Sequence, residues 1–443
     1  MALRKKHLFL PLPIHLALSL FVLAVAPAVE ASTPRGWSDA PVEIHVPPYR
    51  PVVLPGARLG ALQGIPTERI VLFAQHHGEF IPIPFQIDRK DASGRHLIIP
   101  EQGTESPPAA LDAFDECVFM ADDAGLPIAQ LPESFAAMAA QAIHVHSGAA
   151  GGWVYALAFA DTPPSKSPNV YVHYDAERDA ISTDVYRAAF SPDLPFLIDR
   201  FQWKISEAGD WSPNLADTMK VRHTGQLFGV INFKRSQADY RSQLVSVKQG
   251  PIRIIRRTRN SVRMMLGMRT PSLSIDYIAY RRHAVMDTII DLPFPIGWFF
   301  SHVETLTTMD LRNDPGLREM RILHRTVPGG IALDGVTPPG EPNLEKEKDT
   351  DYVIANNFGQ ILVQLDIDKE LPIRKRVYFV DNQELPDPPE NVPGQFGNSG
   401  YATTGWEDVG RGVHHMQFSF TIVPARKLPR GMALLEQAAR IDR

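Results

Sequence analysis

Proline is the feature of this sequence that most restricts its fold. The chain contains 39 prolines among 443 residues, well above the average of about 5%, and they recur between short apolar runs. Proline interrupts a helix because it lacks an amide N–H and its ring clashes with the preceding turn. Since hydrophobic residues make up an ordinary 44% of the chain, the sequence predicts a folded protein of many short strands joined by turns.

Short β-branched or aromatic runs continue through most of the chain, and two of them, 142–146 and 153–159, predict a hairpin. Two segments predict short helices: the alanine-rich residues 132–140, and residues 430–440. Strand after strand without intervening helices indicates antiparallel pairing rather than βαβ units. The predicted fold class is mostly β: an antiparallel β-sandwich, similar to a supersandwich, with a smaller N-terminal β-domain and a short C-terminal helix.

The first 31 residues have the pattern of a signal peptide. A positively charged start at residues 4–6 precedes an apolar stretch over residues 16–26, and Val29 to Ala31 matches the small-residue pattern that signal peptidase cleaves. The apolar run is about half of the ~20 residues that span a bilayer, which favours cleavage after Ala31 over a membrane anchor. We therefore expect a periplasmic or secreted protein with no membrane span after cleavage.

The remaining chain divides by composition. Asp161 to Pro168 combines prolines with small polar residues and has no apolar period, which is typical of a linker. The predicted order is an acidic N-terminal β-domain at 32–160, a linker at 161–168, a large antiparallel sandwich at 169–425 and a C-terminal helix within 426–443.

Charge is distributed very unevenly. Residues 96–165 contain nine acidic side chains and neither lysine nor arginine, whereas residues 240–275 contain seven arginines and one lysine but no acidic residue. Removal of residues 1–31 takes away three basic side chains and one acidic side chain, so the net charge falls from −5 to −7. A net negative chain is not expected to bind nucleic acid, which needs an excess of lysine and arginine.

Arg253, Arg257 and Arg259 share one face of a predicted strand, because side chains alternate along a strand. Three neighbouring guanidiniums require anionic partners. In one interpretation the acidic N-terminal domain docks on this strand within the chain. In the other, the three arginines bind an anionic ligand, since their forked donors match carboxylates, and an anionic, uronate-bearing polysaccharide is then the expected ligand.

His302 and Glu304 are the candidate acid–base pair, since they share a face of another predicted strand. A lyase would neutralise a uronate carboxylate with arginines and remove the adjacent proton. The leading hypothesis is therefore binding, and lyase-type processing, of an anionic carbohydrate. The alternative is a non-catalytic envelope protein that docks a partner protein, such as a redox or assembly component, through its acidic domain; the sequence leaves open whether the chain is an enzyme.

Two groups of side chains are candidates for metal binding. His144 and His146 alternate on a predicted strand, so both imidazoles face one side, but the sequence offers no clear third ligand. Calcium prefers several oxygen ligands, and four carboxylates lie close together in the sequence: Asp112, Asp115, Glu116 and Asp122. Their spacing matches no EF-hand loop, so calcium is a possible cofactor without a recognised motif.

Cys117 is the only cysteine. The chain can therefore form no internal disulfide, and its lone thiol, within an apolar strand-like run, is expected to be buried and unreactive.

Two stretches carry resemblances to known proteins. The segment IPIPFQID at 81–88, with LDAFDE at 111–116 and FMADDAG at 119–125, resembles a signature of exported bacterial proteins of unassigned function. VKQGPIR at 247–253 opens a long antiparallel series, over about 170–425, that resembles the β-supersandwich of galactose-mutarotase-like proteins and polysaccharide lyases. The second resemblance implies a sandwich architecture and places none of that family's catalytic groups on residues of this chain.

Overall fold

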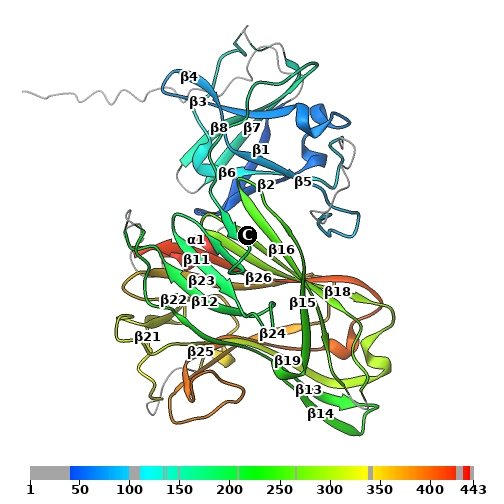
Figure 1. Ribbon diagram of the computed structural model, residues 1–443, viewed down its shortest axis with the longest axis vertical. Helices are drawn as coiled ribbons and strands as arrows, with labels where there is room; N and C mark the ends of the chain where they lie inside the picture. Colours follow the sequence, from blue (N-terminus) through cyan, green and yellow to red (C-terminus); the bar gives the residue numbers. More distant parts are fainter. Residues whose placement is uncertain are drawn as a thin grey trace, which may run out of the picture. The chain divides into compact units, whose positions relative to one another are not determined.

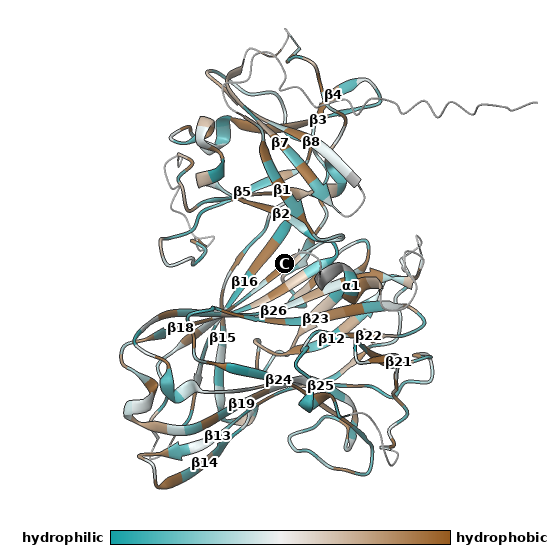
Figure 2. Ribbon diagram, turned by 180° about the vertical axis from the view of Figure 1, so that it is seen from behind, coloured by the Kyte–Doolittle hydropathy of each residue, from teal (hydrophilic) through white to brown (hydrophobic). Residues whose placement is uncertain are grey.

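The computed structural model describes residues 40–98, 110–132, 135, 137–147, 150–206, 209–264, 267–337, 343–425 and 433–439. The fold is mostly β, as predicted. Its several sheets are antiparallel except where one pair of strands is parallel, and the described residues include one short α-helix near the C-terminus. Figure 2 shows hydrophobic and hydrophilic residues interspersed along the strands, in keeping with strands that bury one face. Among the described residues, no helix has the length and apolar character needed to cross a membrane.

Two small sheets are built from strands between Val42 and Phe159 (Figure 1). The five-stranded sheet has the order β1 (Val42–Val46), β7 (Ala137–Ser147), β8 (Ala150–Phe159), β3 (Ile70–His76) and β4 (Glu79–Pro82). The three-stranded sheet has the order β2 (Pro51–Pro55), β6 (Glu116–Met120) and β5 (Phe85–Asp88). The inner faces of both sheets share one apolar core, which includes Phe73, Phe119 and Val154.

Three further sheets follow in the chain. The nine-stranded sheet has the order β15 (Tyr240–Lys248), β16 (Arg253–Val262), β17 (Leu273–Tyr280), β18 (His283–Leu292), β26 (Gly412–Pro424), β23 (Gly359–Ile367), β22 (Tyr352–Ala355), β20 (Arg321–His324) and β21 (Val327–Ala332). The second five-stranded sheet has the order β14 (Ile231–Arg235), β13 (Ala216–Leu227), β19 (Phe300–Leu311), β25 (Gln395–Thr404) and β24 (Arg374–Asn382). A four-stranded sheet has the order β12 (Ile198–Trp203), β11 (Tyr186–Phe190), β10 (Ala180–Ser182) and β9 (His173–Asp175).

A second apolar core joins these three sheets into a sandwich. Met219 and Tyr401 belong to the second five-stranded sheet, Tyr277 and Phe418 belong to the nine-stranded sheet, and Trp203 comes from the four-stranded sheet. All five side chains lie in one buried cluster. The antiparallel sandwich predicted from the strand spacing is therefore confirmed.

Of two local predictions for residues 132–159, one is confirmed and the other is wrong. The hairpin is present, because β7 and β8 pair antiparallel along their lengths. The helix predicted for residues 132–140 is wrong: β7 begins at Ala137, and residues 133, 134 and 136 lie outside the described residues. Ala139 and Ala140 pair with Ala158 and Leu157 of β8, so strand pairing overrides the helix propensity of an alanine-rich stretch.

The C-terminal helix is present as α1 (Ala433–Ala439), shorter than the predicted 430–440. Leu434 and Leu435 are buried and pack with Val353, Leu362 and Val423 of the nine-stranded sheet. The ends of the predicted helix and the predicted signal peptide, residues 1–31, lie outside the described residues.

Candidate metal centre

Strands β1 and β7 bring three candidate metal ligands together. The two strands pair in parallel, with Glu43 beside His144 and His45 beside His146. Ile143 and Val145, between the two histidines and beyond them, point to the opposite face and are buried in the core. The alternation of β7 therefore fixes both imidazoles on the outer face, and the parallel pairing supplies Glu43 on that same face.

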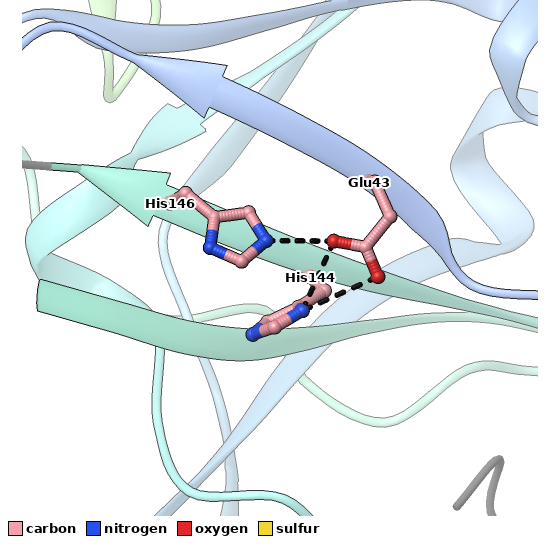
Figure 3. A group of neighbouring side chains, drawn as sticks. All are labelled: Glu43, His144 and His146. Carbon is pink, nitrogen blue, oxygen red and sulfur yellow. Dashed lines mark hydrogen bonds and ion pairs between the residues drawn. The ribbon is translucent and has the colours of Figure 1, made fainter. Parts of the chain in front are cut away.

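The three side chains converge on one another (Figure 3). Glu43 Oε2 lies 2.7 Å from His146 Nε2 and 3.0 Å from His144 Nδ1. One donor atom from each residue lies within 4.8 Å of the other two, which is the only such group of three metal-ligating side chains among the described residues. The group is open to solvent, because the side chain of Glu43 is 52% exposed.

Ring stacking holds the two imidazoles. His144 stacks on Trp153, which is directly opposite on β8, with ring centroids 4.3 Å apart. His146 stacks on His45 with centroids 4.5 Å apart. Gly151 lies opposite His146 on β8, where a Cβ would lie 3.7 Å from His144 Nε2 and 4.0 Å from His146 Nδ1.

The electrostatics of the group favour an ionised carboxylate. Burial alone would raise the pKa of Glu43, but the hydrogen bonds and positive charge of His146 and His144 outweigh it and lower that pKa. Two imidazoles and one carboxylate are a donor set that Zn²⁺ accepts. Sequence reasoning found both histidines and missed Glu43, which lies about a hundred residues earlier and reaches them only through the pairing of β1 with β7.

The three predicted ligand-binding arginines lie on β16 but have different surroundings. The side chain of Arg253 is only 1% exposed. Its Nε donates to Asp88 Oδ2 at 2.6 Å, and its Nη2 donates to Glu116 Oε2 at 2.7 Å. Asp88 and Glu116 belong to β5 and β6 of the three-stranded sheet, so Arg253 links the nine-stranded sheet to the three-stranded sheet.

The carboxylates around Arg253 are held in their ionised form. Burial would raise the pKa of Glu116, but hydrogen bonding from His96 and the charges of Arg253 and Lys90 lower it well below its usual range. The pKa of Asp88 is also lowered, because the charges of Arg253 and Lys248 outweigh the effect of burial. Arg253 is thus the centre of a buried ion-pair network, as in the interpretation that the acidic domain docks on the basic strand within the chain.

Arg257 and Arg259 continue the same face of β16. Arg257 donates two hydrogen bonds of 2.6 Å to the buried carboxylate of Asp276 and a third to the His96 carbonyl. Arg259 is exposed, and no hydrogen bond or ion pair joins its side chain to another described residue. Of the three arginines, only Arg259 therefore has a guanidinium without a partner among the described residues.

The four carboxylates predicted as calcium ligands have separate partners. Asp112 caps a turn by accepting from the backbone N–H groups of Phe114 and Asp115. Asp115 is buried, and burial raises its pKa; Glu116 is bound to Arg253 as described above. Asp122 pairs with Arg282 at 3.0 Å. They do not form a group of three converging ligands within the described residues, so the geometry lends calcium no support.

His302 and Glu304 lie on β19 of the second five-stranded sheet, whereas the three arginines lie on the nine-stranded sheet. A register shift between β13 and β19 falls at these positions, and His302 has a left-handed φ of 50°. This bulge interrupts the alternation from which a shared face was predicted. Glu304 pairs with Arg376 at 3.1 Å.

Cys117 is fully buried in β6, as expected for a structural thiol, and burial raises its pKa to about 12. A thiol with such a pKa is not ionised at neutral pH and is therefore a poor nucleophile.

No protein-family model and no curated protein sequence matches the chain. Among solved structures, the chain is similar to an α-mannosidase from Enterococcus faecalis V583, with a TM-score of 0.43, 9% identity and coverage of 88% of this chain and 43% of the mannosidase. It is also similar to a protein in the glycosyl hydrolase family 38 from Enterococcus faecalis, with a TM-score of 0.42, 8% identity and coverage of 88% and 44%. The chain thus spans less than half the length of either protein, and neither likeness carries a conclusion about its activity.

Proposed function

We propose that the chain is a metal-binding protein whose N-terminal five-stranded sheet holds a zinc ion through Glu43, His144 and His146. The observation that carries this proposal is the convergence of one carboxylate and two imidazoles from two paired strands. Zinc suits the donor set because imidazole nitrogen and carboxylate oxygen are among its usual ligands.

The number of protein ligands favours an ion that also contacts a second molecule. Three protein ligands leave a coordination position for a further ligand, as in zinc sites that act on substrates. A zinc ion held there would supply Lewis acidity toward an oxygen donor of that molecule. The chain's own contribution is to orient the two imidazoles by stacking them on Trp153 and His45.

Calorimetric titration of the metal-free protein with Zn²⁺ tests the proposal. We expect one site per chain, and we expect Glu43→Gln and His146→Ala each to weaken binding at least about tenfold. His173→Ala is the matched control, because His173 is another exposed histidine on a strand. Stoichiometric binding that survives both site substitutions would show that the group is a hydrogen-bonded cluster and not a metal site.

Binding of an anionic carbohydrate is a second candidate function, and Arg259 is the observation that favours it. This exposed guanidinium has no partner among the described residues and continues the face of Arg257. Titration with uronate and neutral polysaccharides, followed by tryptophan fluorescence, provides the test. We expect uronate-selective binding that Arg259→Ala weakens; equal binding of neutral polymers would remove this candidate.

We also propose that the protein is exported and works in the periplasm or outside the cell. The support is the charged start, apolar stretch and small-residue site within residues 1–31. N-terminal sequencing of protein from a periplasmic extract should give a chain that begins at Ser32. An intact Met1 in the soluble cytoplasmic fraction would overturn the proposal.

A further inference from the structure

An apolar cavity lies between the two large sheets of the sandwich. It has a volume of about 210 Å³ and is lined mainly by apolar side chains such as Val221, Val262 and Ile275. A neighbouring apolar cavity of about 120 Å³ shares Met219 and Met286 with it. Protein interiors contain few voids larger than a water molecule, and an apolar cavity of about 150 Å³ is enough to bind benzene. The sandwich therefore has room for an apolar group.

One of the side chains that line this cavity is basic. Arg235 is one of its lining residues, and the guanidinium donates to the carbonyl oxygens of Lys234, Arg263 and Met264. These bonds hold the guanidinium in place, and its charge helps to lower the pKa of nearby Asp239. The acidic lining residue, Asp291, is 61% exposed and lies 4.0 Å from Arg95.

Exposed apolar side chains lie next to the same cavity. In the turn between β13 and β14, Phe228 is 62% exposed and has a left-handed φ of 52°, an uncommon conformation for an aromatic residue. Its ring contacts Phe299, which contacts Phe294, a lining residue. Trp298 is 69% exposed and stacks with Phe294. The aromatic surface is therefore continuous with the cavity wall.

We propose that this cavity binds the hydrocarbon chain of an anionic amphiphile, with Arg235 contacting the anionic head group. The cavity supplies apolar volume, the exposed aromatic side chains extend its wall toward solvent, and Arg235 supplies a positive charge among the lining residues. This site is separate from the proposed zinc site and does not depend on it.

Binding of octanoate, measured by isothermal titration calorimetry, tests the proposal on the full chain, because a short chain matches the cavity volume of about 210 Å³. We expect one site that binds octanoate more tightly than methyl octanoate and far more tightly than butyrate. Met219→Trp and Val221→Phe fill the cavity and should each lower octanoate affinity at least about tenfold. Arg235→Gln should weaken octanoate binding about tenfold, because it removes a charged hydrogen bond, and should leave methyl octanoate unchanged.

The matched control is Met138→Trp, which makes the same substitution at an exposed methionine of β7. It should bind octanoate as the unmodified chain does, and thermal unfolding confirms that each variant is folded. Absence of octanoate binding, or binding that both cavity-filling variants retain, would overturn the proposal. Co-sedimentation with phosphatidylglycerol vesicles without octanoate binding would also overturn it, because the aromatic surface would then contact a membrane and the cavity would hold no chain.

Discussion

Three residues of two paired strands, Glu43, His144 and His146, form the candidate metal centre. His144 and His146 are two positions apart, so strand alternation alone places their imidazoles together. Glu43 joins them because β1 lies parallel to β7 in the five-stranded sheet. Parallel pairing between strands so distant in the chain leaves no local pattern, which is why sequence reasoning missed the carboxylate.

Zinc binding should depend on pH. Imidazole ligates a metal only in its neutral form, whereas Glu43 stays ionised because its histidine neighbours lower its pKa. We therefore expect zinc affinity to fall steeply as the pH is lowered through the range in which histidines become protonated. Equilibrium dialysis with Zn²⁺ at a series of pH values measures this, and an affinity that does not change would argue against histidine ligation.

Two arginines of one strand should differ greatly in their effect on stability. Arg253→Ala removes the buried guanidinium that Asp88 and Glu116 share, which should lower the free energy of unfolding by about 3–5 kcal/mol. Arg259→Ala changes an exposed side chain and should lower it by no more than about 0.5 kcal/mol. Urea unfolding measures the free energy of unfolding of both variants. An equal loss in the two variants would show that the Arg253 network does not stabilise the fold.

At the scale of elements, strands were more predictable than helices. The β7–β8 hairpin follows from alternating apolar residues around a glycine-rich connection. The helix predicted over 132–140 failed because alanine has high helix propensity but also fits between tightly paired strands, and Ala139 and Ala140 are paired with β8. In β19, the bulge at His302 has no signal in the sequence, and it interrupts the alternation from which a shared face with Glu304 was predicted.

The short helix α1 should contribute measurably to stability through its two leucines. Leu435 is fully buried against the nine-stranded sheet, so Leu435→Ala should destabilise the protein by about 2–5 kcal/mol. Glu436→Ala is the control, because Glu436 is exposed on the same helix. Thermal unfolding of both variants provides the comparison; a Leu435→Ala variant as stable as the control would mean that the helix is not docked in solution.

Across the whole molecule, acidic residues of the 96–165 window form ion pairs with arginines of the sandwich. Glu116 and Asp122, from the window rich in acidic residues, pair with Arg253 and Arg282. The sequence predicted that anions must oppose the arginine strand, but it left open whether those anions belong to the chain or to a ligand. Only the packing of the three-stranded sheet against β16 distinguishes the two for Arg253, and no local pattern encodes that packing.

Acid should therefore destabilise the protein through this network. The pKa values of Asp88 and Glu116 are lower in the folded chain than the values of about 3.9 and 4.3 expected when unfolded. Their contribution to stability is complete above the unfolded values and is lost as the pH falls through the folded values. Urea unfolding between about pH 3 and pH 7 should show a smaller pH dependence for Glu116→Gln than for the unmodified chain, and an unchanged dependence would contradict this assignment.

X-ray absorption at the zinc edge, on protein loaded with one equivalent of Zn²⁺, tests the proposed metal centre most directly. The account predicts a first shell with two imidazole nitrogens, whose outer-ring scattering is visible, and oxygen from Glu43, and it predicts loss of one imidazole in His146→Ala. A shell of oxygen alone, or a spectrum that His146→Ala leaves unchanged, would contradict the assignment of Glu43, His144 and His146 as the zinc ligands.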